Sequence, residues 1–242
     1  MKKLINIVIV FLAWELVAFV IHRAIVPYPH DIFVYMFSKG FLYYQSHIAY
    51  SLIRLLIGLS LTIIVSLFIG ILAFDRPKMK SFVDKATYWS YPIPKMSLLP
   101  IVMMFLGLSE STKITMIFLI TFFPAIINIR DALELIPESV LELFYSLGAS
   151  KKILIKRVLF PAILPAIFTS MRISVGIALS VLFFTENFGT THGLGYLIMN
   201  AWMRIDYTGM YAGVFIISLI GVIMYSGLDF LGKKACPWLT RR

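Results

Sequence analysis

The chain has 242 residues, of which 60% are hydrophobic and only 14% are charged, and its formal net charge is +10. Soluble domains are about 45–50% apolar, so this composition excludes an ordinary soluble protein and predicts a chain that lies mostly in lipid. The basic residues stand between apolar runs, and we therefore interpret them as a signal of membrane topology rather than of nucleic-acid binding. The single cysteine excludes an internal disulfide framework and a zinc site built on paired cysteines.

Several apolar runs are long enough to be candidates for membrane-spanning helices, which need roughly 20 residues each. Continuous apolar runs favour helices over barrel strands, because each backbone polar group in hydrocarbon must find a partner within its own segment. The sequence predicts an all-α, polytopic membrane protein with one domain over residues 1–242 and six transmembrane helices. The predicted spans are Leu4–Ile21, Leu52–Phe74, Tyr91–Leu108, Ile114–Ile129, Ile173–Phe188 and Met210–Leu231.

The first run begins after two lysines, as a signal peptide does. It also contains Trp14 and Glu15 and lacks a small-x-small cleavage site, so we expect it to be retained as the first span. The segment from Pro27 to Ser51 is too polar to span comfortably and is expected to hold a short interfacial helix. The loop from Asp75 to Tyr88 is polar and basic, and we expect it to face anionic lipid headgroups in the cytoplasm.

The orientation is predicted from the basic residues, because Lys and Arg collect in cytoplasmic loops. Most of the 22 basic residues lie on one side of the six predicted spans, which places both termini in the cytoplasm. The basic residues on the external side are Arg23, Lys39, Arg54, Lys113 and Arg204.

The segment between the fourth and fifth spans, about residues 131–171, is much longer than a turn between helices requires. Pro137 and Glu138 suit the first turn of a helix, and apolar positions recur from there to Leu147. Gly148 is expected to end this helix as a left-handed C-cap, and Ser150 to begin a second helix as its N-cap. The segment is therefore predicted to be a cytoplasmic helix–turn–helix.

Glu142, Gly148 and Pro161 resemble the EAA loop of permease subunits of binding-protein-dependent ABC importers. The family pattern reads Glu-Ala-Ala, three residues, Gly, nine residues, and Ile-x-Leu-Pro, and the spacing here matches throughout. Other motifs, such as Gly193-Leu194-Gly195-Tyr196, are similar to those of the nitrate, taurine, alkanesulfonate and bicarbonate branch. Each departure from the loop pattern exchanges one apolar residue for another, at Leu143, Phe144, Val158 and Phe160.

The resemblance implies that the first helix of this loop docks, through its apolar face, in a groove of a separate ATPase subunit that binds the ATP. It implies a homodimer of permeases, two ATP-binding-cassette ATPase subunits, an extracytoplasmic solute-binding protein and a bacterial or archaeal cytoplasmic membrane. The chain itself is expected to be no enzyme and to hold no metal or cofactor. The expected ATPase-contact residues are Glu138, Leu141, Glu142, Phe144, Tyr145, Leu147, Gly148, Ala149, Ser150 and Pro161.

The expected solute is small and polar or anionic, of the nitrate, sulfonate or bicarbonate type; the alternative is a vitamin or pyrimidine precursor. A self-sufficient channel or carrier is less favoured, because it would normally show intramembrane ionisable pairs or inverted repeats. Glu186, at the outer end of the fifth span, should face a water-filled path or a polar partner rather than lipid, or else tie down the external loop. The translocation path is expected to include Met103, Glu186 and Asn187.

Overall fold

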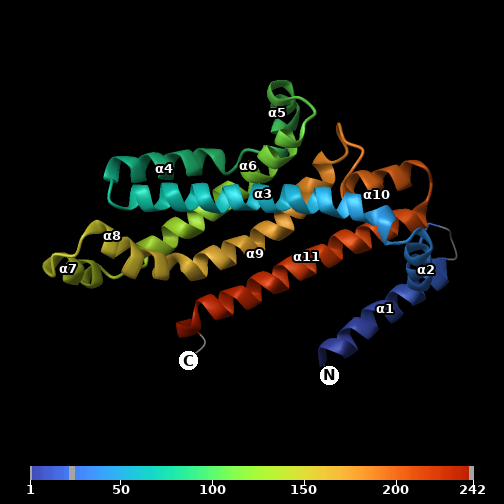
Figure 1. Cartoon of the computed structure of the whole chain (residues 1–242), viewed down its shortest axis with the longest axis horizontal. Helices are drawn as coiled ribbons and strands as arrows, with labels where there is room; N and C mark the ends of the chain where they lie inside the picture. The colour runs from blue at the N-terminus through green and yellow to red at the C-terminus, as the bar shows by residue number, and fades with distance from the viewer. Residues whose placement is uncertain (1, 22–24, 240–242) are drawn as a thin grey trace. The chain divides into compact units, whose positions relative to one another are not determined.

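The computed structural model describes residues 2–21 and 25–239, and these residues form helices and connecting turns without a β-strand (Figure 1). The prediction of an all-α fold is confirmed. The chain divides into two compact units, each made of segments that are far apart in the sequence. The first unit comprises Met1–Ile53 and Phe183–Ile220, and the second comprises Arg54–Leu182 and Gly221–Arg242. Arg23, Arg241 and Arg242, which the topology prediction uses, lie outside the described residues.

The first unit packs its helices around a small apolar cluster of Tyr44, Leu194, Leu197 and Ile216. The interfacial helix predicted within Pro27–Ser51 is present as α2, which begins at a proline, and a second helix starts directly after it. The helices of this unit are α1 (Lys2–Ile21), α2 (Pro29–Lys39), the first part of α3 (Phe41–Phe74), the last residues of α9 (Phe160–Thr185), α10 (Leu194–Met203) and the first part of α11 (Tyr207–Ala235).

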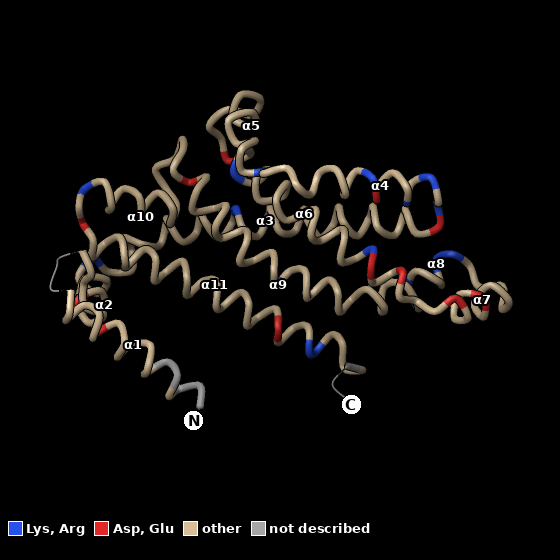
Figure 2. Tube along the Cα trace, turned by 180° about the vertical axis from the view of Figure 1, so that it is seen from behind, with Lys and Arg blue, Asp and Glu red and all other residues tan. Residues whose placement is uncertain are grey.

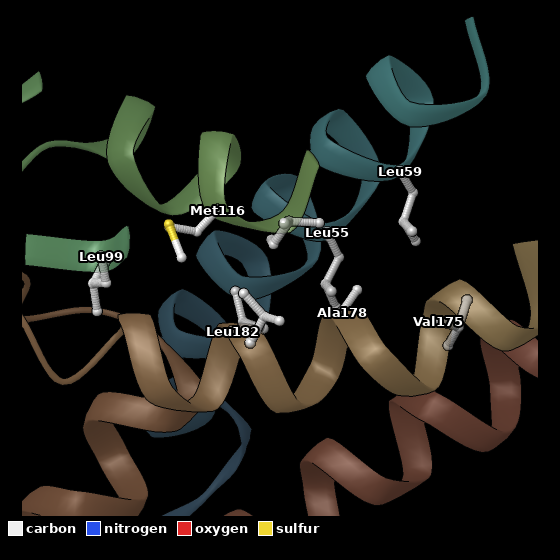
Figure 3. Packing of buried hydrophobic residues seen from close by; sticks show 9 residues of the cluster. Leu55, Leu59, Leu99, Met116, Val175, Ala178 and Leu182 are labelled. Atoms are coloured by element: carbon white, nitrogen blue, oxygen red, sulfur yellow. The ribbon is translucent and has the colours of Figure 1, made fainter. Parts of the chain in front are cut away.

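The second unit contains the larger core, in which side chains from α3, α5, α6 and α9 meet. Figure 3 shows Leu55 and Leu59 of α3, Met116 of α6 and Leu182 of α9 gathered between the ribbons. The elements that lie wholly in this unit are α4 (Pro77–Ser90), η1 (Lys95–Leu98), α5 (Leu99–Leu106), α6 (Glu110–Glu134), α7 (Glu138–Ser146), α8 (Lys151–Leu154), η2 (Ile155–Leu159) and η3 (Pro237–Leu239).

A stripe of small residues lets α3 approach α6 closely. Gly58, Thr62 and Gly70 recur at multiples of four residues, so they share one helix face. A Cβ at Gly58 would lie 2.5 Å from Cγ2 of Ile117, and the hydroxyl oxygens of Thr62 and Thr121 are 2.6 Å apart. Small residues and interhelical hydroxyl bonds are the means by which helices associate in lipid. The α3–α6 contact is therefore of the kind by which helices pack against each other in a membrane.

Four helices in the described residues are long and apolar enough to cross a membrane: Phe41–Phe74, Glu110–Glu134, Lys151–Thr185 and Tyr207–Ala235. They contain four of the six predicted spans, whereas the first and third predicted spans correspond to the shorter apolar helices Val8–Ile21 and Lys95–Leu106.

Two predictions of local structure are wrong. The predicted loop Asp75–Tyr88 is mostly the 14-residue helix α4, which Pro77 can start because a proline fits the first helical turn. The predicted span Tyr91–Leu108 is not one helix, because the chain is non-helical up to Pro94 before η1 and α5 follow.

Charged residues are concentrated near α4, the end of α6 and the α7–α8 region, whereas α9 and α11 are almost free of charge over several turns (Figure 2). Ion pairs connect these elements in the second unit. Arg130 of α6 lies 2.8 Å from Asp84 of α4, and Lys151 of α8 lies 2.6 Å from Asp75 at the end of α3. The pairs fasten α4 and α8 to the longer helices.

Candidate functional site

The EAA segment, residues 131–171, contains α7, a tight turn and α8. Pro137 is the N-cap of α7 (φ −60°, ψ 136°) rather than its first helical residue. Gly148 has a φ of 66°, in the left-handed region. The N–H of Gly148 donates to the carbonyl of Tyr145 at 3.0 Å, and the N–H of Ala149 donates to that of Phe144 at 3.0 Å. These two bonds form a Schellman motif, so the predicted left-handed C-cap at Gly148 is confirmed.

The two faces of α7 have different surroundings. Leu141 and Phe144 are partly buried and pack against a separate apolar cluster of the second unit, which includes Ile129, Leu133 and Leu159. Leu143 and Leu147, which are four residues apart and thus neighbours on the helix surface, are 58% and 73% exposed. Tyr145 is also exposed. The exposed apolar face of α7 is therefore centred on Leu143 and Leu147. Leu147 and Tyr145 are among the expected contact residues, and Leu143 is not.

The polar residues of α7 and of its turn are arranged around that exposed face. Glu138 and Glu142 are exposed, as are Gly148 and Ser150, whereas Ala149 is partly buried. Ser150 occupies the N-cap position of α8 (φ −67°, ψ 153°), but its side chain accepts no capping hydrogen bond. The structure thus brings the predicted contact residues from Glu138 to Ser150 together on α7 and its turn, whereas Pro161 lies farther along the chain, in α9.

The second helix of the EAA segment continues into the fifth span. The elements α8, η2 and α9 form one helix, Lys151–Thr185. Its η2 portion is a π-helical turn that directly precedes Phe160 and Pro161. Pro161 has no N–H to donate to the carbonyl of Arg157, and a widened turn accommodates such a missing bond. Pro161 therefore lies within a continuous helix that begins at the α7–α8 turn.

A cavity of about 380 Å³ lies between α3, α4, α6 and α7. Leu141 and Glu138 contribute the α7 side of its wall. Its charged wall includes Lys80, which lies 3.1 Å from Glu134, and Arg130, which is paired with Asp84 on α4. The inner side of α7 therefore faces a cavity whose wall is partly apolar and partly made of ion-paired side chains.

Glu186 belongs to a set of side chains that cap the N-terminus of α10 in the first unit. Its side chain is 0% exposed. Its carboxylate accepts hydrogen bonds from the hydroxyl of Ser51 at 2.8 Å and from the N–H of Gly195 at 2.8 Å. Ser51 Oγ also accepts from the N–H of Leu194 at 2.8 Å, and His47 Nδ1 accepts from that of Gly193 at 3.1 Å.

The backbone N–H groups of Gly193, Leu194 and Gly195 therefore have partners on α3 and at Glu186. The start of a helix would otherwise leave such groups unpaired. A carboxylate is also favoured at the positive end of the helix dipole. These contacts give Glu186 a polar partner, as the sequence predicts, and fix the loop between α9 and α10. The adjacent Asn187 is partly buried, and its Oδ1 has no hydrogen-bond partner among the described residues. Met103 lies in the other unit, where it packs against the core cluster.

Further polar contacts in the first unit fix the start of α11. Asp206 accepts a hydrogen bond from the N–H of Gly209 at 2.8 Å, as an N-cap does, and another from the hydroxyl of Tyr35 at 2.6 Å. Burial raises the pKa of Tyr35, and the hydrogen bond to Asp206 raises it further, so this hydroxyl stays protonated at neutral pH. Ile205, just before this cap, has a φ of 60° and is 72% exposed.

The lone cysteine is not an accessible tail residue. Cys236 follows the last turn of α11 and is 3% exposed. Burial also raises the pKa of its thiol. Nothing in the described residues groups His, Cys, Asp and Glu side chains as a metal site would. The described residues of α7 present an exposed apolar face next to the start of the continuous helix Lys151–Thr185.

Comparison with known proteins agrees with this geometry. A family model described as the binding-protein-dependent transport system inner membrane component matches residues 63–235. The formylaminopyrimidine transport permease protein ThiX of Halalkalibacterium halodurans is 30% identical and matches over 95% of this chain and 92% of its own length. The taurine transport system permease protein TauC of Escherichia coli is 28% identical over 79% of this chain and 70% of its own.

A putative aliphatic sulfonates transport permease protein, SsuC of Bacillus subtilis, is 28% identical over 98% of this chain and 87% of its own. Among solved structures, the MetNI methionine ABC transporter in inward-facing conformations has the same fold, with a TM-score of 0.64 at 16% identity, covering 82% of this chain and 98% of that one. Family membership implies a multi-pass membrane protein that works with an ATPase and a solute-binding protein. The chain belongs to the binding-protein-dependent inner membrane components and is the permease subunit of an ABC importer, a transport protein rather than an enzyme.

Proposed function

We propose that the exposed face of α7 couples ATP hydrolysis by a separate ATPase subunit to solute movement through this chain. The observation that carries the proposal is the pair of exposed leucines, Leu143 and Leu147, held on a helix whose end is fixed by the turn at Gly148. Exposed leucines are costly in water, so a partner that buries them gains free energy. The continuous helix after the turn gives such a partner a rigid connection to the fifth span.

The complete machine in this proposal contains two copies of this chain, two ATPase subunits that bind the ATP, and one extracytoplasmic solute-binding protein. It lies in the cytoplasmic membrane of a bacterium or archaeon, with both termini of this chain in the cytoplasm. The basic residues near α4 and α8 support this orientation, because cytoplasmic segments carry most of the Lys and Arg residues.

The experiment is co-purification of the ATPase subunit with variants of this chain. Leu143→Glu and Leu147→Glu should each abolish co-purification, because a carboxylate in an apolar groove is costly to desolvate. Phe82→Glu is the matched control: Phe82 is an apolar residue that is 70% exposed on α4, outside the EAA segment. Retention of the ATPase by both leucine variants, or its loss with Phe82→Glu as well, would contradict the assignment of the docking face.

The solute in this proposal is small and polar or anionic, in line with the taurine and aliphatic sulfonate relatives. A pyrimidine precursor is the second candidate, because the formylaminopyrimidine permease ThiX is similar over nearly the whole chain. Calorimetric titration of the partner binding protein with taurine, methanesulfonate, nitrate, bicarbonate and formylaminopyrimidine distinguishes the two. Binding of formylaminopyrimidine alone would replace the first candidate with the second.

A further inference from the structure

The third predicted span is interrupted at two prolines, and this break leaves backbone carbonyls without their usual donors. Pro92 and Pro94 follow the end of α4 and have no N–H to donate to the preceding helical turn. The Ser90 carbonyl, which Pro94 leaves without its helical donor, accepts from the N–H of Ile93 at 3.2 Å, and the ammonium group of Lys95 adds a further donor. Its Nζ donates to the carbonyls of Ser90 at 2.9 Å, Tyr91 at 3.2 Å and Ile93 at 3.4 Å.

A second interrupted helix lies at the same place. Pro124 is inside α6, so the carbonyl of Ile120 lacks the helical donor four residues later. Ile120 and Pro124 both line a cavity of about 430 Å³, together with residues of the break at Tyr91, Lys95 and other positions. Residues of the α4–η1 break and of the Pro124 turn of α6 therefore line the same space.

Among the described residues, no acidic side chain pairs with Lys95. Three basic residues on the long apolar helices do lie near carboxylates: Arg54 and Lys113 near Glu110, and Arg172 near Asp229. In the part of the chain that the structure describes, Lys95 contacts only carbonyl oxygens and the rings of Tyr91 and Phe123, at 5.7 and 4.7 Å. Carbonyls and rings attract a cation but leave its net charge in place.

We propose that the cavity at the α4–η1 break is a binding site for the solute on its way through the membrane, in which Lys95 holds an anionic group. The contact to Ile93, at 3.4 Å the longest of the three, is the one that an anion would replace. The freed carbonyl of Ile120 would accept a hydrogen bond from an N–H or O–H group of the same solute. The site thus favours a small organic anion, and a hydrogen-bond donor on that anion would add a second contact. This inference rests on the proposal that the solute is polar or anionic.

The transport test compares Lys95→Gln with Lys95→Arg in proteoliposomes that contain the ATPase and binding protein. Gln keeps a donor for the carbonyls and removes the charge, whereas Arg keeps the charge. If the wild type imports taurine or methanesulfonate, Lys95→Gln should slow that uptake about tenfold, since a hydrogen bond to a charged group contributes that factor or more. Lys95→Arg should stay within about threefold of the wild type.

Equal uptake by Lys95→Gln would overturn the site while leaving the importer function intact. Import of formylaminopyrimidine but of no anion would also overturn it. Failure of the wild type to import any solute in the panel would instead contradict the proposed solute class.

A second readout needs no transport and applies whatever the natural solute is. In the full-length chain in nanodiscs, methanesulfonate should slow the reaction of Lys95 with an amine-reactive ester. Mass spectrometry of the modified peptide measures the rate of this reaction. Dimethyl sulfone, a neutral molecule of similar shape, should not slow it. Lys85 on α4 serves as the internal control, because it lies outside the cavity. Equal rates with both molecules would overturn the proposal.

Discussion

Substitutions of Gly148 test the effect of backbone strain alone, because a side chain at this position meets no steric clash. The φ of Gly148 is 66°, and a Cβ at this position would meet nothing within 4 Å. Gly148→Ala therefore adds no contact and changes only the conformational preference of the turn. A residue with a Cβ pays about 1–2 kcal/mol in the left-handed region. This reduces the population of the Schellman turn, relative to other turn conformations, by roughly 5- to 30-fold.

The expected result is a loss of coupling with the fold retained. Gly148→Ala should lower solute uptake per ATP hydrolysed in proteoliposomes, and Gly148→Val should lower it further, because β-branched residues tolerate positive φ least. Gly148→Asn should recover part of the activity, since Asn is the next best residue at this cap position.

Gly176→Ala is the matched control. Gly176 lies inside α9, has no contact within 4 Å of a Cβ and has no positive φ. Alanine there should raise the free energy of unfolding by about 0.5–1 kcal/mol and leave uptake unchanged. The reasoning is refuted if Gly148→Val imports solute at the wild-type rate with the ATPase still bound.

Three further predictions concern the first unit and the tail. Glu186→Gln should destabilise the chain by about 1–3 kcal/mol in thermal melts and slow uptake several-fold. The reason is that an amide oxygen accepts hydrogen bonds from the N–H of Gly195 and from Ser51 less well than a carboxylate does. An unchanged melting temperature and uptake rate would remove any role for the charge. Ile205→Asn should stabilise it by about 1 kcal/mol by relieving a positive φ, and a lower melting temperature would contradict this. Impermeant maleimide should label the buried Cys236 slowly even in inside-out vesicles. In a Cys236→Ser background, the exposed position of Leu147→Cys should react rapidly in those vesicles. Preferential labelling of Leu147→Cys in intact cells would invert the topology.

The sequence was sufficient where one residue decides the local geometry. Gly148 was predicted to adopt a left-handed conformation because only glycine adopts it without strain, and no distant contact was needed. The long spans were also readable, because an apolar run of that length has few alternatives to a membrane helix. The third span was misread because its apolar composition outweighed Pro92 and Pro94, which end α4.

Features that depend on distant partners could not be predicted in detail. The need of Glu186 for a polar partner followed from the cost of a carboxylate in hydrocarbon. The identity of that partner, Ser51, did not, because the two residues are 135 positions apart in the chain. The exposed face of α7 could not be predicted for a similar reason. Leucines at 141, 143 and 147 cover both sides of a short helix, and only packing against the core decides which side stays exposed.

The continuity of the helix Lys151–Thr185 makes it a lever. Its 35 residues, at about 1.5 Å each, give a rod roughly 50 Å long that starts at the α7–α8 turn. A tilt of about 10° at one end would displace the other end by roughly 9 Å, by simple geometry on that length. A small rotation at the α7 end of this helix would thus become a displacement comparable to the diameter of a helix.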